Sequence, residues 1–340
     1  MIRRSMFLIL SVMTAMTTRL PAADLKVSGD ASIIPSGAKF ETLWEEGGFT
    51  EGAAAGPDGL IYFSDFAQPF DSGPARVMKF DPKTGKTAVH SPNSGMANGL
   101  MFTRDGRLIA CCASPLGGHR ALCEVQADGK MKPIVSTFDG KRFNSPNDLV
   151  IDRKGRIYFS DPKYVGPEKM ELASFDVYRL DPDGSLHVAT KAIEKPNGVM
   201  LSPDGTTLYV AETNNGSATA DLDKEKSTPG RMTLNAFDMK SDGTLGKKRV
   251  LHDFGTETGI DGMTVNTDGH IFAAVRSASR FGIVCFDANG KELAYIQTPV
   301  LPTNCVFGRG DQQHTLYITA GSGLYRITLA VTGHHPALAD

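Results

Sequence analysis

Six polar side chains recur at equivalent places along this chain, and together they could bind a cation. Each is a carboxylate or a primary amide that stands seven residues before a turn: Glu51, Asn98, Asn147, Asn197, Asp261 and Asn304. All six offer oxygen ligands, which hard cations prefer. If they converge, two buried carboxylates would repel each other unless a cation balanced them. The set predicts one divalent metal ion, Ca²⁺ first, with Mg²⁺, Mn²⁺ or Zn²⁺ as alternatives.

An internal repeat sets the spacing of these residues. Five segments share a Gly-containing turn and a following apolar run rich in β-formers, and a degenerate sixth copy follows; they begin at Asp58, Asp105, Lys154, Asp204, Asp268 and Asp311. A second turn follows each of the first five, so each unit holds about four strands. Units of about 40–50 residues with four strands are typical of propeller blades.

We therefore predict an all-β fold, a six-bladed β-propeller with four-stranded blades over residues 24–330. The sixth copy supplies too few strands, so the N-terminal segment 39–44 is expected to complete the last blade and close the ring. The first strand of each blade lines the central channel, which would bring the six polar side chains together at one end. The alternative for any single one is a local role, such as an Asx turn before Gly99 or Gly198.

The same topology predicts which loops surround that end of the channel. The connections between second and third strands should return to it: 66–75, 114–120, 162–175, 214–231 and 277–281. Loop 214–231 is the longest, and the sequence leaves open whether it covers the site or is a surface insertion.

The two ends of the chain have their own predictions. Arg3 and Arg4 precede an apolar run, and small residues follow it, which is the layout of a secretory signal peptide over residues 1–23. The run is too short to span a bilayer, so we expect a secreted or periplasmic protein without a membrane span. Residues 331–340 are expected to form a flexible C-terminal tail.

Composition limits the classes of partner. The 36 basic and 38 acidic residues form no single-sign block, so nucleic acid is not expected as a partner, and nothing indicates an obligate protein partner. The five cysteines are odd in number and lack CxxC spacing, which favours neither a disulfide framework nor a zinc site. We expect small buried apolar residues, with at most one bridge.

Several motifs resemble one protein family. They occur in order as Phe143-Asn-Ser-Pro-Asn-Asp-Leu149, Tyr158-Phe-Ser-Asp-Pro162, Pro196-Asn-Gly198, Ile260-Asp-Gly-Met263 and Thr303-Asn-Cys305. From about Phe40 to Leu329 the chain resembles the senescence-marker-protein, gluconolactonase and luciferin-regenerating-enzyme family, which extends to calcium-dependent phosphotriesterases. The resemblance implies that Glu51, Asn197 and Asp261 hold the metal, that Asn147 contacts the metal or the substrate, and that Asp261 is also the general base.

Two segments depart from the pattern of that family. Its members often carry Glu-Gly-Pro at the first metal position, where this chain has Glu51-Gly52-Ala53. Gluconolactonases of the family carry a segment with Glu-His-Gly and paired arginines after blade two. Residues 113–120 take the place of that segment in this chain. The second departure leaves the identity of the substrate open.

The residues and the resemblance together predict a metal-dependent, gluconolactonase-like hydrolase that opens a small sugar lactone by attack of water. Asp261 would accept the proton. Contacts with the substrate are expected from Asn98, Asn147, Asn304, His119, Arg120, Tyr164 and Arg276. Two alternatives stay open: hydrolysis of organophosphates or other esters at the same site, and a non-catalytic ligand-binding propeller with a structural ion.

Overall fold

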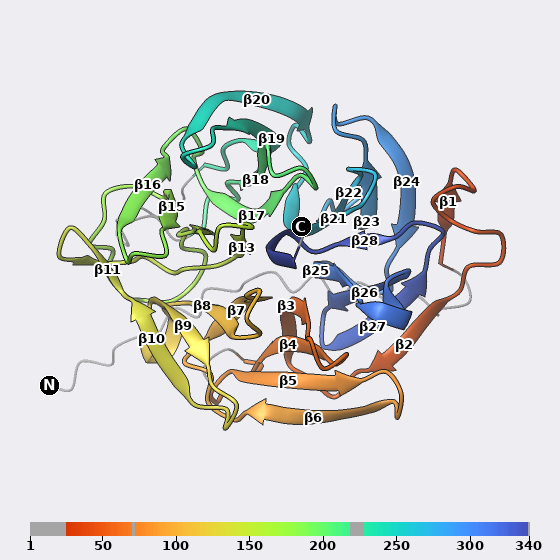
Figure 1. The fold of residues 1–340 in the computed structure, drawn as a ribbon, viewed down its shortest axis with the longest axis horizontal. Helices are drawn as coiled ribbons and strands as arrows, with labels where there is room; N and C mark the ends of the chain where they lie inside the picture. Colours follow the sequence, from red (N-terminus) through yellow and green to blue (C-terminus); the bar gives the residue numbers. More distant parts are fainter. Residues whose placement is uncertain (1–24, 70–71, 218–227, 339–340) are drawn as a thin grey trace, which may run out of the picture.

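Six antiparallel sheets are arranged in a ring around a common centre (Figure 1). The computed structural model describes residues 25–69, 72–217 and 228–338. The predicted signal peptide and the middle of loop 214–231 lie outside these ranges. Neighbouring innermost strands contact one another around the ring, and the space between them is called the channel below. The predicted six-bladed propeller is confirmed.

The first three blades each consist of four strands that are consecutive in their sheet. From the centre outward, the first blade contains β3 (Phe49–Ala55), β4 (Ile61–Phe66), β5 (Arg76–Asp81) and β6 (Lys86–Ser91). The second contains β7 (Ala97–Phe102), β8 (Leu108–Cys112), β9 (Ala121–Val125) and β10 (Met131–Val135). The third contains β13 (Leu149–Ile151), β14 (Ile157–Ser160), β15 (Val177–Leu180) and β16 (Leu186–Thr190). A short hairpin of β11 (Thr137–Phe138) and β12 (Lys141–Arg142) separates the second and third blades.

The fourth blade is again four consecutive strands, whereas strands from the ends of the chain join the fifth and sixth blades. The fourth contains β17 (Pro196–Leu201), β18 (Thr207–Thr213), β19 (Met232–Met239) and β20 (Leu245–Asp253). The fifth contains β21 (Ile260–Asn266), β22 (Ile271–Val275), β23 (Gly282–Phe286) and β24 (Glu292–Gln297), flanked by β28 (Gly333–His334) inside and β1 (Val27–Gly29) outside. The sixth contains β25 (Pro302–Phe307), β26 (Thr315–Ala320), β27 (Gly323–Thr328) and β2 (Phe40–Trp44).

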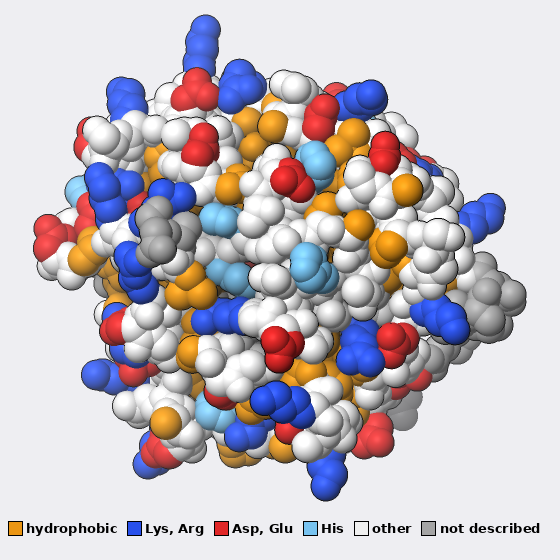
Figure 2. Space-filling model, turned by 45° about the vertical axis from the view of Figure 1, so that its right-hand side comes forward, with side chains coloured by type: hydrophobic (Ala, Val, Ile, Leu, Met, Phe, Trp, Pro, Cys, Tyr) orange, Lys and Arg blue, Asp and Glu red, His pale blue; other side chains and the backbone are white. Residues whose placement is uncertain are grey.

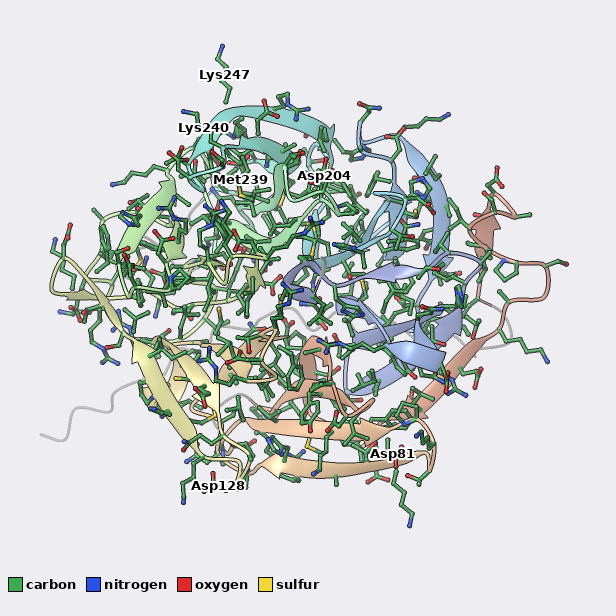
Figure 3. The ribbon with its side chains drawn as sticks, in the orientation of Figure 1. Asp81, Asp128, Asp204, Met239, Lys240 and Lys247 are labelled. Carbon is green, nitrogen blue, oxygen red and sulfur yellow. The ribbon has the colours of Figure 1, made fainter. Side chains whose placement is uncertain are left out.

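The turns follow the chemistry expected from the repeats. In the first blade Gly59 adopts a φ of +80°, a left-handed backbone that glycine reaches without a Cβ clash. Asp58 supports this turn, because its Oδ1 accepts the backbone N–H of Leu60 at 3.1 Å. Figure 3 shows the second-turn residues Asp81 and Asp128 at the rim, far from the centre. These two aspartates therefore play no part in the channel.

The core lies mainly between adjacent blades. Between the sixth and first blades, for example, Phe63, Phe80 and Tyr317 are fully buried in one cluster. Similar clusters join the other neighbouring blades. Burying each such side chain contributes about 1.5–3 kcal/mol, so the interfaces between blades hold the innermost strands in place.

The last blade closes as predicted. β2 pairs antiparallel with β27, with Phe40 opposite Ile327, and so supplies the missing outer strand. The pairing covers an edge that would otherwise expose unpaired backbone groups. β1 was not predicted; it pairs with β24 and widens the fifth blade.

The segment after residue 330 does not form the expected flexible tail. β28 pairs with β21 inside the fifth blade, with His334 opposite Val265, and the 3₁₀ helix η4 (Pro336–Leu338) follows. Pro336 and Ala337 are buried, and His335 Nε2 lies 3.1 Å from the carbonyl oxygen of Gly308. This segment lies near the centre of the ring in Figure 1. The segment packs there rather than in solvent because β28 pairs with the inner edge of β21 and because its apolar residues are buried.

Helices are few and short in the described ranges. Besides η4 there are η2 (Pro115–Gly117) and η3 (Gly310–Gln312). No helix in this part of the chain is long and apolar enough to cross a membrane. On the face that Figure 2 presents, side chains of both charges are interspersed.

Candidate active site

A cavity of about 230 Å³ opens at one end of the channel, and five of the six predicted ring residues line it. They are Glu51, Asn98, Asn147, Asn197 and Asp261. They come from the innermost strands of five blades or from the residues just before them. Four of the five predicted connections reach this cavity, through Phe66, Pro115, Tyr164 and Asn215, whereas no residue of connection 277–281 lines it.

Irregular strand pairing aims the ring residues into the cavity. The register between first and second strands shifts at Glu51/Ala53, Ala97/Leu100, Pro196/Val199 and Ile260/Met263. A β-bulge of this kind inserts an unpaired residue and turns a side chain away from the regular alternation. Asn98 and Asn197 lie within strands rather than in turns, so the alternative of isolated Asx turns is wrong for both.

The glycine that follows most ring residues permits close contact between neighbouring innermost strands. A Cβ on Gly52 would lie 2.2 Å from the carbonyl oxygen of Asn98, and one on Gly198 would lie 2.4 Å from that of Asp261. No real Cβ tolerates such distances from backbone, so only glycine fits. Each of these Glu-Gly, Asn-Gly and Asp-Gly pairs therefore places a candidate ligand where neighbouring innermost strands approach closely.

Two carboxylates share the cavity. Glu51 and Asp261 are 6 % and 9 % exposed. Burial raises the pKa of Glu51 well above its ordinary value, and the charge of Asp261 raises it further. Burial also raises the pKa of Asp261, whereas Arg276 and Asn197 act in the opposite direction. The cavity therefore disfavours two negative charges unless a positive partner joins them.

Asn197 and Arg276 hold Asp261 from two sides. Asn197 Nδ2 donates to Asp261 Oδ1 at 2.9 Å, and Arg276 Nη1 lies 3.2 Å from Asp261 Oδ2. Arg276 also donates to the carbonyl oxygen of Pro302 at 2.9 Å, and its guanidinium lies over the ring of Phe49. These contacts fix the direction in which the Asp261 carboxylate points.

One buried atom fits a cation site. Asn197 Oδ1 is buried and has no hydrogen-bond partner among the described residues, although buried acceptors are nearly always paired. It belongs to the amide whose nitrogen already contacts Asp261, and Glu51 lines the same cavity. An unsatisfied amide oxygen beside two carboxylates is the donor set that a hard divalent ion takes. The residues present therefore fit a metal such as Ca²⁺.

Two of the predicted loop residues contact the site. Arg276 does so as described, and Tyr164 lines the cavity while its hydroxyl donates to the carbonyl oxygen of Thr213 at 3.1 Å. Behind Tyr164, Lys195 Nζ lies 4.9 Å from the centre of its ring. Tyr164 is therefore held rigidly at the cavity wall.

Three predicted contact residues do not line the cavity. Arg120 is buried elsewhere, where its Nε donates to the carbonyl oxygen of Phe143 at 2.6 Å. His119 packs against Gly95 and Cys123 in the second blade. The Asn304 side chain lies over Gly262, deeper in the channel, and its Oδ1 accepts the Cys305 N–H at 2.8 Å. The repeat spacing did not distinguish Asn304 from the other ring residues, and the position of His119 and Arg120 in a predicted loop did not show which way their side chains point.

Asp148 is a buried channel residue that the sequence analysis missed. It follows Asn147 at the position that glycine occupies after four of the other ring residues. Its Oδ1 accepts the Leu149 N–H at 2.9 Å and its Oδ2 accepts the Val199 N–H at 3.3 Å. Burial raises the pKa of Asp148 to about 7. The sequence signal for Asp148 was an acidic residue at a position where four of the other ring residues are followed by glycine.

Comparisons with known proteins agree with this arrangement. Residues 116–322 match the family model described as the SMP-30/gluconolactonase/LRE-like region. A gluconolactonase from Zymomonas mobilis is 29% identical over 319 residues, which cover 91% of this chain and 69% of that protein. A pentonolactonase from Haloferax volcanii is 27% identical over 73% of this chain and 75% of its own.

Solved structures give the same result. A gluconolactonase from Xanthomonas campestris has a TM-score of 0.75 and 30% identity, covering 90% of this chain and 94% of its own. A calcium-binding regucalcin from Agrobacterium tumefaciens, 19% identical, shares the fold with a TM-score of 0.68 over 89% of this chain and 98% of its own. Since the family model spans well over half of the residues and the fold extends over nine-tenths of them, this chain belongs to the SMP-30/gluconolactonase/LRE-like family.

Proposed function

We propose that this protein is a metal-dependent lactonase that hydrolyses a small sugar lactone in the cavity at the end of its channel. The observation that carries the proposal is the pair of buried carboxylates, Glu51 and Asp261, beside the unpaired oxygen of Asn197. The relatives named gluconolactonase and pentonolactonase support the substrate class. The cavity of about 230 Å³ is smaller than the pockets of about 300–1,000 Å³ that take drug-sized ligands, which suits a single sugar ring.

Four side chains would hold the ion: Glu51, Asn147, Asn197 and Asp261. Ca²⁺ is the first candidate because all their ligand atoms are oxygens, with Mg²⁺, Mn²⁺ or Zn²⁺ as alternatives. When bound, the ion would supply a Lewis acid for the carbonyl oxygen of the lactone.

Asp261 would act on the attacking water. Arg276 and Asn197 lower the pKa of Asp261 against the effect of burial, which keeps its carboxylate able to accept a proton. Attack of the water on the carbonyl carbon transfers one proton to Asp261 and breaks the C–O bond of the ring. The proton then passes to the oxygen that leaves, so the product is a hydroxy acid.

The rest of the cavity would position the sugar. Asn98 offers an amide, and the Tyr164 hydroxyl lies at the same wall. Phe49 and Phe66 supply an apolar side, which suits the C–H face of a sugar ring. Segment 113–120, which departs from the family pattern, borders the cavity through Ala113 and Pro115.

A substrate screen tests the proposal. Chelator-treated protein would be assayed on aldonolactones, other esters and organophosphates, each with Ca²⁺, Mg²⁺, Mn²⁺ or Zn²⁺ added back. We expect lactone hydrolysis that disappears on chelation and returns with the ion. Hydrolysis of organophosphates alone would replace the proposed substrate class, and inactivity on every substrate would favour a ligand-binding propeller. Full activity in thoroughly chelated protein would contradict the proposed metal dependence.

A further inference from the structure

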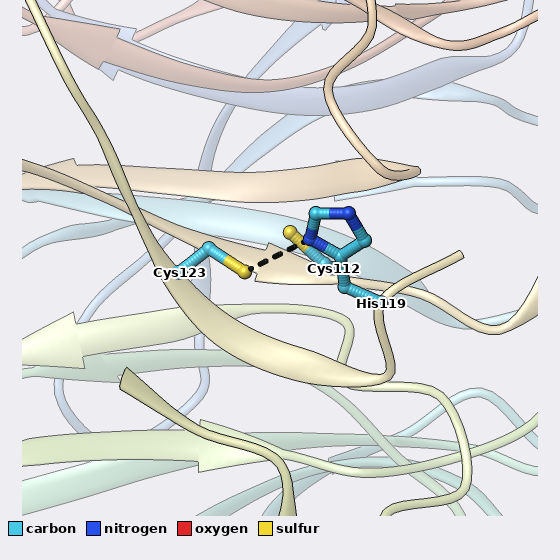
Figure 4. Close-up of side chains that lie close together, drawn as sticks. All are labelled: Cys112, His119 and Cys123. Atoms are coloured by element: carbon cyan, nitrogen blue, oxygen red, sulfur yellow. Dashed lines mark hydrogen bonds between the residues drawn. The ribbon is translucent and has the colours of Figure 1, made fainter. Parts of the chain in front are cut away.

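A second group of possible metal ligands lies in the second blade, outside the cavity lining. Cys112, His119 and Cys123 approach one another there (Figure 4). Their ligand atoms all lie within 4.8 Å of one another, and Cys123 Sγ is 3.5 Å from His119 Nδ1. No other group of three or more His, Cys, Asp or Glu side chains is this close in the part of the chain that the structure describes.

The β8–β9 hairpin brings the three residues together. Cys112 pairs with Ala121 and Ala110 pairs with Cys123, so the two cysteines are diagonal neighbours on one face of the sheet. His119 lies in the loop between the strands. This explains why the spacing of the cysteines alone did not indicate a metal site: the third ligand depends on how the loop folds back.

The loop is held in an unfavourable backbone conformation that places His119 over the two cysteines. Leu116 and Arg120 have φ values of +56° and +53°, and Met96 beneath the loop has +66°. Three of the four non-glycine residues with positive φ in the described ranges thus surround this group. Such residues each cost about 1–3 kcal/mol and tend to cluster at ligand sites.

Specific contacts fix the imidazole. The His119 N–H donates to the Gly95 carbonyl oxygen at 3.0 Å. A Cβ on Gly95 would lie 2.6 Å from the His119 ring, so the ring packs directly on the glycine backbone. Arg142 Nη2 donates to the His119 carbonyl oxygen at 3.3 Å. These contacts of the His119 backbone and ring position the side chain, and none of them involves a residue that lines the cavity.

The separation of Cys123 Sγ and His119 Nδ1, which are hydrogen-bonded in the structure, is compatible with a zinc site. In a tetrahedral zinc site the sulfur–metal and nitrogen–metal distances of about 2.3 and 2.0–2.1 Å place sulfur and nitrogen about 3.6 Å apart. The observed 3.5 Å between Cys123 Sγ and His119 Nδ1 agrees with that edge. Two sulfurs and one imidazole nitrogen select a softer metal than the oxygen ligands of the channel.

We propose that Cys112, His119 and Cys123 form a second metal site, for Zn²⁺, which fastens loop 113–120 to the second blade. Both cysteines are buried, whereas His119 is half-buried, so a metal ion would enter the site on the side of the imidazole. A water molecule would serve as the fourth ligand of the ion. The same loop carries Ala113 and Pro115 in the cavity wall. The site would therefore stabilise one wall of the cavity, whatever reaction takes place there.

Cobalt spectroscopy tests this site separately from the channel. Reduced, chelator-treated protein would first be saturated with Ca²⁺ and then titrated with Co²⁺ in the presence of a non-thiol reductant. We expect a sulfur-to-cobalt charge-transfer band in the near ultraviolet that saturates at one equivalent and disappears when Zn²⁺ is added. The oxygen ligands of the channel cannot produce this band. Its absence in the wild-type protein would overturn the proposal.

Three variants and one control assign the ligands. Cys112→Ser and Cys123→Ser should lose the band, whereas Cys285→Ser, a buried cysteine in the fifth blade, should keep it. His119→Gln changes only a half-buried loop side chain and should weaken Zn²⁺ binding at least about tenfold. If either serine variant fails to fold, His119→Gln decides. Unchanged affinity in His119→Gln, or loss of the band in Cys285→Ser, would contradict the assignment.

Discussion

The two levels of the channel contain similar residues in different electrostatic situations. At the open level, Glu51 and Asp261 share a cavity in which Asn197 Oδ1 has no partner among the described residues. At the deeper level, a small space is lined by Asp148, Asn304 and the C-terminal His334 and His335. There the Asp148 carboxylate accepts two backbone N–H groups, and the Asn304 amide oxygen accepts another.

At the deeper level the chain supplies hydrogen-bond donors for its buried polar groups. At the open level it leaves Asn197 Oδ1 without a donor among the described residues. A buried carboxylate with two backbone donors is part of the structure, even though burial raises its pKa. Two carboxylates beside an unpaired amide oxygen are not compensated by the chain, apart from the contact of Arg276 with Asp261. We therefore expect the open level, rather than the deeper level, to bind the proposed cation.

The largest effect is expected for Asp261→Asn. The variant would lose both a proposed metal ligand and the proposed proton acceptor, so kcat/KM for the lactone should fall at least about 100-fold, within the range for a general base. The matched control is Asp128→Asn at the rim of the second blade, which should keep wild-type activity. Thermal unfolding followed by circular dichroism should show that both variants are folded. Full activity of Asp261→Asn would contradict the assignment of the reaction to the open level of the channel.

Asp148 provides the corresponding test of the deeper level. Because its pKa is raised from 3.8 to about 7, the folded protein favours the protonated acid. The contribution is fully present below about pH 4 and is lost as pH rises through about 7, by on the order of 4 kcal/mol in total. The free energy of unfolding of the wild type should therefore fall, relative to Asp148→Asn, between pH 4.5 and 8.

Urea unfolding of chelator-treated protein would measure this difference. Asp128→Asn again serves as the control, because hydrogen bonds from Lys130 lower the pKa of the exposed Asp128 and so cannot produce a fall of that sign. A wild-type minus Asp148→Asn difference that does not change with pH would mean that Asp148 is not held protonated by the fold.

A smaller effect is expected for Arg276→Gln. Arg276 lowers the pKa of Asp261 against the effect of burial, so its removal should raise that pKa and move the acid limb of the pH–activity profile to higher pH. Arg276→Lys keeps the charge and should restore most of the original profile. If the acid limb of Arg276→Gln coincides with that of the wild type, Arg276 does not tune Asp261.

The fold could be predicted almost completely because its signals are local and repeated. The turn at Gly59 and the apolar positions around it recur in the first five blades, and the spare N-terminal strand indicated how the ring closes. The C-terminal segment could not be predicted from its composition. Its order comes from pairing between His334 and Val265, which are far apart in the sequence.

The site was predicted at the level of strand position but not of side-chain direction. Glu51, Asn197 and Asp261 were identified because the repeat fixes where each innermost strand begins. Asn304 shares that spacing, yet its side chain turns over Gly262 instead. His119 and Arg120 lie on a predicted loop, but their partners, Cys123 and Phe143, depend on the path of the loop back to the blade. A single sequence contains no periodic pattern from which such side-chain contacts could be predicted.

Calorimetric titration of Ca²⁺ into chelator-treated protein tests the central claim most directly. If Glu51, Asn197 and Asp261 surround one ion, the wild type should bind one Ca²⁺ per chain, and Glu51→Gln should bind it at least about tenfold more weakly while remaining folded. Equal affinity in Glu51→Gln and the wild type, or no Ca²⁺ binding by the wild type, would contradict the assignment of a calcium site to this end of the channel.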